Sequence, residues 1–268
     1  MTARPILLLT LGGYAVEGGF DRRYEPATCY SPTIALGRHA GPGVADGLWT
    51  DYERVLEIAS ELGLDGVRLS VEWARVEPRR GHVDYEALDR YAQVVSHAAS
   101  LGLHVTIALV DAAWPAWLGL EAWLLPWVVP HVLGHAKRVV AHVGDARGVV
   151  VFADARRLTR GGYVEGTLPP WRRGEHEDAK RAQRQIEEIC ARLEADPVVG
   201  AKIVREVLTI DLQEGGLRDA RAATQYAEVH VRSLVKGTGP TEAPSGLLVR
   251  HSGEWTLAPS PDVLDLLR

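Results

Sequence analysis

Apolar residues along the chain fall into two alternating patterns. Short runs rich in Val, Ile and Leu are separated by longer segments in which apolar residues recur every three or four positions. The short runs are typical of buried strands and the longer segments of amphipathic helices. Strands are predicted at Ile6–Leu11, Gly66–Val71, His104–Val110, Gly148–Phe152 and Ala201–Ile210, with a weaker one at Gly246–Arg250. This alternation predicts βα units around a parallel sheet.

Helices are predicted between these strands. They span Thr50–Leu62, Tyr85–Leu101, Val128–His142, Asp178–Ala195 and Asp219–Val235. Asp84 precedes the second helix, in a position where its side chain can cap the first turn. Loops are expected at Asp21–Val44 and Lys236–Ser245, which are rich in Gly, Pro and polar residues. Nothing marks a domain boundary, so a single domain over residues 1–268 is expected.

Composition narrows the class of protein. Hydrophobic residues make up 46% and charged residues 24% of the 268 residues, which are ordinary globular values. The net charge of −5 and the lack of a basic stripe argue against a nucleic-acid partner. No apolar stretch reaches transmembrane length and the N-terminal run is short for a secretion signal, so we expect a cytoplasmic protein without a membrane partner. Cys29 and Cys190 match no metal or disulfide spacing, and we expect no metal and no cofactor.

The densest motif is Gly66-Val-Arg-Leu-Ser-Val-Glu-Trp-Ala-Arg-Val-Glu-Pro78. It resembles the second strand of glycoside hydrolase family 1, the β-glucosidase family, which carries Arg-Phe/Leu-Ser-x-x-Trp-x-Arg-x-x-Pro. Four further segments resemble that family's motifs in the same order along the chain, namely Leu11–Gly19, Leu109–Leu118, Val151–Ala155 and Gly162–Pro170. The resemblance implies an α/β fold with a (β/α) TIM-type barrel. Because six strands are counted here and the family has eight, we expect the barrel to be shortened or incomplete.

The chain also departs from the family at positions that carry its chemistry. Ala15 replaces the family's sugar-binding Gln, Asp111 replaces its third-strand His, Ala153 replaces an Asn, and Asp154 replaces the acid/base Glu. The nucleophile motif Thr-Glu-Asn-Gly is not found. The nearest string, Leu208–Leu212, places Ile210 at the nucleophile position with Asp211 beside it. A standard retaining β-glucosidase is therefore not expected.

Barrel enzymes place their sites at the C-terminal ends of the strands. The charged residues at predicted strand ends are Glu17, Arg68, Glu72, Asp111, Asp154, Glu206 and Asp211. Of these, Asp154, Asp111, Glu206 and Asp211 are the catalytic candidates. Asp154 with Glu206 or Asp211 would suit an inverting reaction, whose carboxyl groups stand about 6.5–9.5 Å apart. The alternative for each acid is an ion pair or a helix cap.

Substrate-binding candidates follow partly from the resemblance. They are Arg68, Glu17, Tyr14, Trp114, Tyr163 and Trp255. Arg68 resembles the arginine that holds the family's nucleophile. The segment His251–Trp255 resembles the family's Asn-Phe-Glu-Trp, but Gly246–Val249 equally resembles the Phe-Gly-Leu-Val that follows it, so the register of this region is open.

Three functions are compatible with these residues. The first is a family 1-like enzyme with an altered active site, acting on a modified sugar or small polar metabolite by carboxylate acid/base chemistry. The second is a glycosidase with Asp154 as its acid, and the third is a catalytically inactive homologue that serves as a binding or scaffold protein. Convergence of Asp111, Asp154 and Arg68 in one cleft would favour an enzyme.

His131 and His135 share one helix face, but we interpret them as exposed histidines and not as zinc ligands. The sequence leaves the oligomeric state open.

Overall fold

The computed structural model describes residues 8–20, 25–204, 208–212, 247–251 and 254–258 of the chain. Its contacts divide the chain into two units. One unit is Ile6–Val204, and the other contains Met1–Pro5 and Arg205–Arg268. Each unit is described by itself, so the expected single domain over residues 1–268 stays a prediction.

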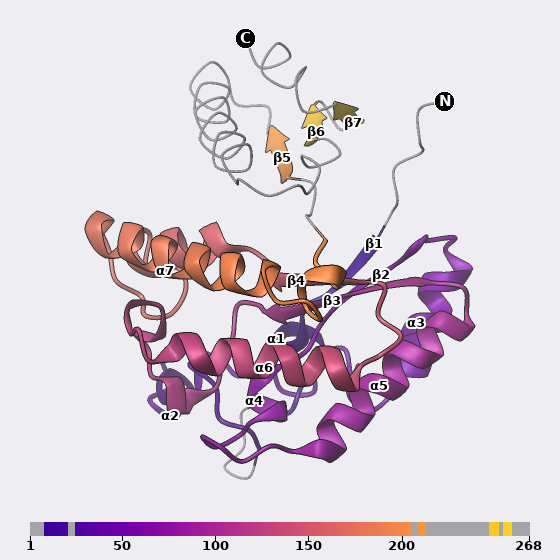
Figure 1. Cartoon of the computed structure of the whole chain (residues 1–268), viewed down its shortest axis with the longest axis horizontal. Helices are drawn as coiled ribbons and strands as arrows, with labels where there is room; N and C mark the ends of the chain where they lie inside the picture. The colour runs from indigo at the N-terminus through magenta and orange to yellow at the C-terminus, as the bar shows by residue number, and fades with distance from the viewer. Residues whose placement is uncertain (1–7, 21–24, 205–207, 213–246, 252–253, 259–268) are drawn as a thin grey trace. The chain divides into compact units, whose positions relative to one another are not determined.

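The first unit is built on a four-stranded parallel sheet (Figure 1). Its strands are β1 (Leu8–Leu11), β2 (Gly66–Ser70), β3 (His104–Val110) and β4 (Gly148–Phe152), which lie side by side in chain order. The pairing is in register across the sheet, with Thr10 opposite Arg68 and Arg68 opposite Thr106. These strands confirm the first four predicted ones to within two residues at each end.

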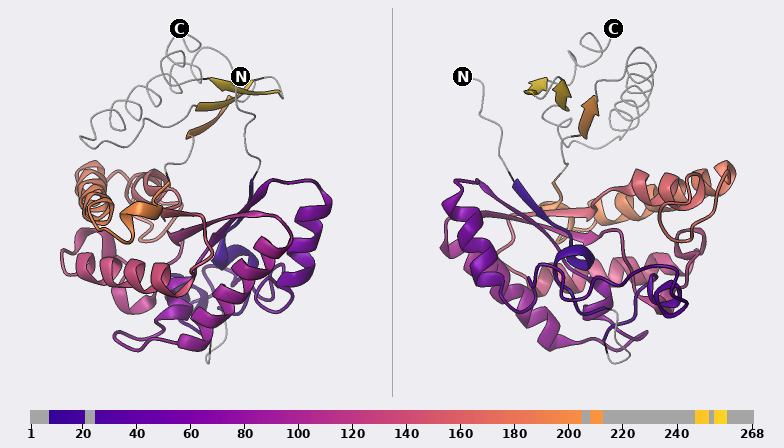
Figure 2. Two further views of the ribbon diagram at one scale, coloured as in Figure 1. Left: turned by 45° about the vertical axis from the view of Figure 1, so that its right-hand side comes forward. Right: turned by 180° about the vertical axis from the view of Figure 1, so that it is seen from behind.

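Helices connect the strands and lie around one side of the sheet (Figure 2). They are α3 (Tyr52–Glu61), α5 (Tyr85–Ser100), α6 (Val128–His142) and α7 (His176–Glu194). A parallel strand pair needs such a crossover, because the chain has to return to the same end of the sheet. The described βα units form a partial (β/α) barrel, which confirms the predicted fold class.

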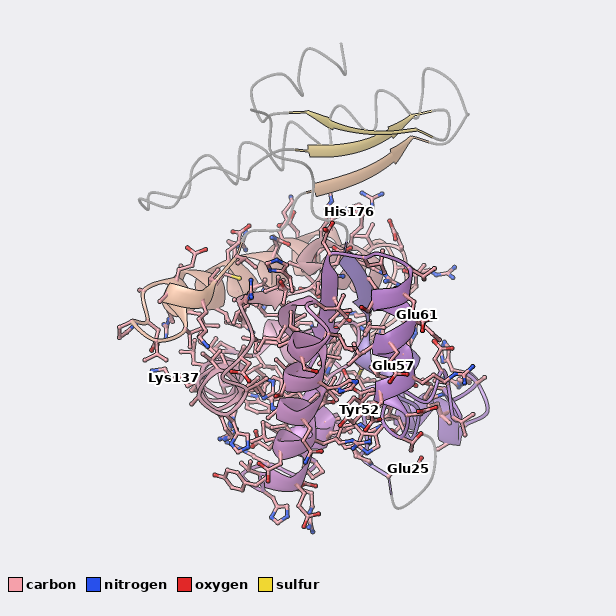
Figure 3. The ribbon with its side chains drawn as sticks, turned by 90° about the vertical axis from the view of Figure 1, so that its right-hand side faces the viewer. Glu25, Tyr52, Glu57, Glu61, Lys137 and His176 are labelled. Carbon is pink, nitrogen blue, oxygen red and sulfur yellow. The ribbon has the colours of Figure 1, made fainter. Side chains whose placement is uncertain are left out.

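The helices form because their apolar residues share one face. In α3, Tyr52, Leu56 and Ala59 are buried, whereas Glu57 and Glu61 point outward into solvent (Figure 3). At the start of α5, Asp84 Oδ1 accepts a 3.0 Å hydrogen bond from the backbone N–H of Ala87. This confirms the predicted cap.

The core between the helices and the sheet includes one residue that we had expected outside it. His135 on α6 is fully buried, which corrects the expectation of an exposed histidine. Its ring stacks on the buried Trp73, with ring centroids 4.7 Å apart, and its Nε2 lies 3.2 Å from the carbonyl oxygen of Leu109. Burial lowers the pKa of His135 to about 3, so the ring is uncharged at neutral pH.

The predicted strand Ala201–Ile210 is wrong in its first half. Gly200–Lys202 forms a 3₁₀ turn instead, and only Ile203 bridges to Val149 of β4. A Cβ atom on Gly200 would lie 2.2 Å from the carbonyl oxygen of Glu194, so the chain turns back tightly against the end of α7. This tertiary contact interrupts a sequence that locally reads as a strand.

The second unit has its own three-stranded sheet. Its strands are β5 (Leu208–Leu212), β6 (Leu247–His251) and β7 (Glu254–Ala258). β5 pairs with β6 in parallel, and β6 pairs with β7 in antiparallel orientation. The weaker predicted strand at Gly246–Arg250 is therefore confirmed, whereas the predicted helix Asp219–Val235 and loop Lys236–Ser245 lie outside the described residues.

Short helices occupy the loops at the C-terminal ends of the strands. α1 (Gly13–Val16) follows β1, α2 (Ser31–Ala35) lies within the predicted loop Asp21–Val44, and α4 (Trp73–Val76) follows β2. No helix in the described part of the chain is long and apolar enough to cross a membrane. The loops with α1 and α4 carry the charged residues described next.

Candidate active site

Three carboxyl groups follow the C-terminal ends of neighbouring strands. Glu17 ends α1, Glu72 directly precedes α4, and Asp111 follows β3. We call Glu17, Glu72 and Asp111 the carboxyl cluster. Consecutive parallel strands end at the same edge of a sheet, which is why residues far apart in the sequence are brought together here.

Two adjacent glycines, Gly12 and Gly13, allow the three carboxyl side chains to pack close to the backbone. A Cβ atom on Gly13 would lie 2.7 Å from Glu72 Cγ and 3.1 Å from Glu17 Oε1. A Cβ atom on Gly12 would lie 3.1 Å from Asp111 Oδ2. All three acids therefore approach the Gly12–Gly13 backbone, where a side chain would have to displace them.

Glu17 is held in place by hydrogen bonds to both of its carboxylate oxygens. Arg75 Nε donates to Glu17 Oε2 at 2.6 Å, and the Tyr91 hydroxyl donates to Oε1 at 2.7 Å. The Arg75 guanidinium also lies over the rings of Phe20 and Trp49, at 4.2 and 4.1 Å. Burial raises the pKa of Glu17, and the charge of Arg75 with these hydrogen bonds opposes the rise.

Glu72 is the unusual member of the cluster. The residue is 1% exposed, and its Oε2 is buried without a hydrogen-bond partner among the described residues. Its backbone N–H donates to the Tyr91 hydroxyl at 3.0 Å, which fixes the position of the residue. Burial raises the pKa of Glu72 well above its ordinary value, and the charges of Glu17 and Asp111 raise it further. The buried position of Glu72 therefore favours its uncharged form more than an exposed position would.

Asp111 is half-buried, so it is the cluster member that meets solvent. Its Oδ2 accepts a 2.6 Å hydrogen bond from the Ser70 hydroxyl, and its Oδ1 accepts a 2.8 Å hydrogen bond from the backbone N–H of Ala112. These donors hold the carboxylate in one orientation. Asp111 was predicted as a catalytic candidate, and the structure places it in the carboxyl cluster.

The remaining candidates near β1 and β2 line the sheet and its end. Arg68 lies on β2, half-buried between Thr10 and Thr106 in the register. Tyr14 follows the two glycines, and its ring stacks on Tyr30 with centroids 4.7 Å apart. Tyr14 therefore directly follows Gly12 and Gly13, the two glycines that the carboxyl cluster packs against.

Asp154 has a different environment from Asp111. It is exposed, and its Oδ1 accepts a 2.8 Å hydrogen bond from the backbone N–H of Arg157. Arg157 begins a single turn of π-helix, Arg157–Gly161, so Asp154 caps this turn. Its Oδ2 makes no hydrogen bond to the described residues. The predicted catalytic role of Asp154 stays a prediction, with the cap as its observed contact.

Two predicted substrate-binding aromatic residues belong to the core in this structure. Trp114 is fully buried against Trp123, and its Nε1 donates to the Gly119 carbonyl oxygen at 2.8 Å. Tyr163 is also fully buried. Core packing, the alternative to a stacking surface, is the observed environment of Trp114, and the substrate-binding roles of Trp114 and Tyr163 stay predictions.

The three remaining candidates, Glu206, Asp211 and Trp255, lie outside the described residues of the first unit. Glu206 lies outside the described residues, and Asp211 and Trp255 lie on β5 and β7 of the second unit. Their roles stay predictions. Among the described residues, no group of three or more His, Cys, Asp or Glu side chains has the arrangement of a metal site.

The sequence interpretation did not select Glu72 or Tyr91 as site residues. Glu72 was noted as a strand-end acid, and its signal is a carboxyl group directly beside the apolar run of β2. Tyr91 lies within the apolar face of α5, where its hydroxyl gives no sequence signal. Its contacts with Glu17 and Glu72 arise only in the folded chain.

A cavity of about 400 Å³ adjoins Glu17 and Arg75. Glu25, Trp49, Thr50 and the backbone of Gly18 and Gly19 complete most of its lining. Gly18 and Gly19 both have positive φ angles, of 74° and 76°, which an ordinary side chain disfavours. The cavity therefore depends on this glycine pair.

Comparisons with known proteins point to one group of enzymes. The family model of a β-galactosidase group, glycoside hydrolase family 42, matches residues 48–122. β-Glucosidase 21 of Oryza sativa subsp. japonica is 26% identical over 166 residues, which cover 59% of this chain and 32% of that protein. β-Glucosidase 47 of Arabidopsis thaliana is 28% identical over 166 residues, covering 60% and 31% respectively. The chain spans about a third of the length of these curated relatives.

Solved structures show the same fold. A β-glycosidase from Pyrococcus horikoshii superposes with a TM-score of 0.71 at 15% identity, covering 95% of this chain and 58% of that one. A family 1 β-glucosidase from Thermotoga maritima superposes with a TM-score of 0.65 at 16% identity, covering 83% and 52%. The expected resemblance is thereby confirmed: the chain is similar to glycoside hydrolases, the β-glucosidases among them, and its first unit forms a partial (β/α) barrel.

Proposed function

We propose that the chain is a glycoside hydrolase-like enzyme with an altered active site. Its substrate is a modified sugar or small polar metabolite, and its chemistry is carboxylate acid/base catalysis. The observation that carries the proposal is the carboxyl cluster at the ends of β1, β2 and β3, where the buried Glu72 lies near Asp111, whose orientation the Ser70 hydroxyl fixes. Burial and the neighbouring acids raise the pKa of Glu72 above its ordinary value. Carboxyl groups with different protonation states in one site are the usual basis of acid/base catalysis.

Asp111 is the group that we assign to contact the substrate. Hydrolysis of a glycosidic bond delivers a proton to the leaving oxygen and removes one from the attacking water. Asp111 is half-buried and fixed by Ser70 and the Ala112 N–H, so it reaches solvent in a defined orientation. Glu72 and Glu17 are the buried positioning residues of the cluster.

A second carboxylate is needed for either stereochemical course. Asp154, Glu206 and Asp211 remain the candidates for this group. Asp154 is supported by its exposed position after β4, the strand next to β3, and by an Oδ2 that its capping role leaves available. Arg68, Tyr14 and Trp255 remain proposed substrate contacts, and the cytoplasmic location stays a prediction.

One observation favours a second candidate function, a catalytically inactive homologue that binds a ligand. Asp154 replaces the family's acid/base Glu, and its observed contact is the structural cap at Arg157. If Asp154 only caps this turn, the site has no catalytic acid at this position. The carboxyl cluster would then recognise a ligand without transforming it.

The test measures turnover and stability together. The purified protein is incubated with a panel of neutral and modified glycosides, and released sugars are followed by NMR. If Asp111 acts on the substrate, Asp111→Asn lowers kcat/KM at least about 100-fold with little change in Tm. Glu57→Gln, on the outer face of α3, is the control and keeps full activity. Full activity in Asp111→Asn refutes the assignment, and binding without any turnover selects the inactive homologue.

A further inference from the structure

The carboxyl cluster contains more carboxyl groups than there are cations in its described contacts. It brings three carboxyl groups together, and the cation in its described contacts is Arg75, which is already engaged by Glu17. Arg75 is further held between Phe20 and Trp49, and it donates to the carbonyl oxygen of Gly18. Glu17 and Arg75 therefore form an ion pair, and Glu72 and Asp111 have no cation in their described contacts beyond the one that Glu17 already binds.

Glu72 is also unsatisfied in the folded chain. Its buried Oε2 has no hydrogen-bond partner among the described residues, and an unpaired buried polar atom is unfavourable for the folded state. The residue cannot move away freely, because its N–H is bound to Tyr91 and its Cγ packs over Gly13. Glu72 therefore leaves one buried polar atom unpaired at a strand end, beside the half-buried Asp111.

The chemistry of the missing partner follows from what the cluster offers. Asp111 accepts one hydrogen bond at each oxygen, and each oxygen retains a further lone pair. The Ser70 hydroxyl is already turned toward Asp111 as a donor. The site thus presents acceptors and negative charge. A protonated amine supplies up to three donors and a positive charge, whereas a hydroxyl supplies one donor and no charge.

We propose that the substrate of this site is an amine-bearing sugar or polyol, with its ammonium group seated on Asp111 beside Glu72. This inference rests on the proposed function and names its substrate class. One of the two acids departs from the resembling family, because Asp111 stands where that family has His. A neutral sugar would leave the same acids without a counter-charge.

Binding of a cation at this site should be accompanied by the release of a proton, which can be measured. A positive charge beside Glu72 favours its ionised form, so binding should release a proton to the buffer. The groups that face Glu72 are Glu17 from α1, Asp111 from the end of β3, Arg75 from α4, Tyr91 from α5, and Cys29 and Tyr30 from the loop before α2. Burial raises the pKa of Cys29 and Tyr91 well above their ordinary values, so these two stay protonated and do not contribute to the release near pH 6.5.

The experiment compares matched sugars that differ in one group. Glucose and its 2-amino, 3-amino and 6-amino deoxy analogues are titrated calorimetrically at pH 6.5, in two buffers with different ionisation enthalpies. At least one amino analogue should bind about 10-fold or more tightly than glucose and release protons. Asp111→Asn should remove that preference. Glu72→Gln should keep binding but abolish the proton release, and Glu57→Gln should behave as the unchanged protein does.

The outcomes separate this inference from the proposed function. Equal binding of glucose and all amino analogues overturns the amine preference. If neutral glycosides are then turned over in a manner that depends on Asp111, the proposed function stands without it. If the amino sugars bind with proton release but no glycoside is turned over, amino sugars are ligands of this site and not substrates. The proposed enzyme activity is then refuted.

Discussion

Arg75 and Glu17 form a buried ion pair, with 2.6 Å between Arg75 Nε and Glu17 Oε2. The pair joins α4, which follows β2, to the end of α1, which follows β1. Tyr91 from α5 adds a hydrogen bond to the same carboxylate. Three segments that are distant in the sequence are therefore held at one end of the sheet by the contacts of a single acid.

Arg75→Ala should destabilise the protein strongly. The substitution leaves the Glu17 carboxylate buried without its cation and removes the guanidinium from between Phe20 and Trp49. Breaking a buried pair in this way costs about 3–5 kcal/mol, which urea denaturation would measure as a lower free energy of unfolding. The control is Lys180→Ala, whose partner Glu177 lies in an exposed pair at 2.7 Å. It should not change stability measurably, and equal effects of both substitutions would contradict the argument.

Stability should fall as pH rises, and Glu72 should be a main cause. Its folded-state pKa is raised above the ordinary value of 4.5, so the folded protein retains a proton that the unfolded chain has lost above that pH. The free energy of unfolding then decreases between pH 4.5 and the folded-state pKa, by up to about 1.4 kcal/mol per pH unit for one such group. Glu17, whose pKa burial also raises, adds in the same direction.

Glu72→Gln tests this pH dependence. The amide keeps the shape of the side chain and cannot ionise, so its unfolding free energy should vary less between pH 5 and 8 than that of the unchanged protein. Urea denaturation at several pH values measures both profiles. Glu57→Gln is the control and should leave the profile unaltered. Parallel profiles for Glu72→Gln and the unchanged protein would show that Glu72 does not retain its proton.

Gly13→Ala should disturb the carboxyl cluster. The added Cβ would lie 2.7 Å from Glu72 Cγ, so the glutamate has to move, at a cost of about 1–3 kcal/mol. Gly134→Ala is a matched control in the interior of α6, where a Cβ meets nothing within 4 Å. It should stabilise the protein by up to about 1 kcal/mol, because alanine favours helix. Thermal denaturation compares the two, and a neutral Gly13→Ala would indicate a looser cluster.

Ordinary aryl β-glucosides should be poor substrates. Ala15, Asp111 and Ala153 replace three polar residues that the resembling family uses to bind its sugar, and the nucleophile motif is not found. A buried sugar hydroxyl without a partner loses binding energy. Turnover of a nitrophenyl β-glucoside, followed by absorbance, should fall well below about 1 per second. A rate within the common enzyme range of about 1–1000 per second would refute this expectation.

The four parallel strands and the helices between them were predictable from local patterns. The strand β4 is apolar throughout, β2 and β3 are mainly apolar with a few polar residues such as Arg68 and Thr106, and the apolar residues of α3 and α5 recur at helical spacing. The predicted strand at Ala201–Ile210 failed for a non-local reason. Gly200 packs against the backbone of Glu194, and this contact turns the chain where the local pattern continues as a strand.

The sequence by itself determined which residues can carry charge at the strand ends, because it sets the order of strands and the residue that follows each one. It identified Asp111 and Glu17 in this way. Only the tertiary structure decided their states. Tyr91 reaches Glu17 and Glu72 from another helix, Gly13 lets both acids approach, and the burial of Glu72 leaves its Oε2 without a partner. Protonation depends on desolvation and on neighbouring charges, and both are properties of the three-dimensional neighbourhood.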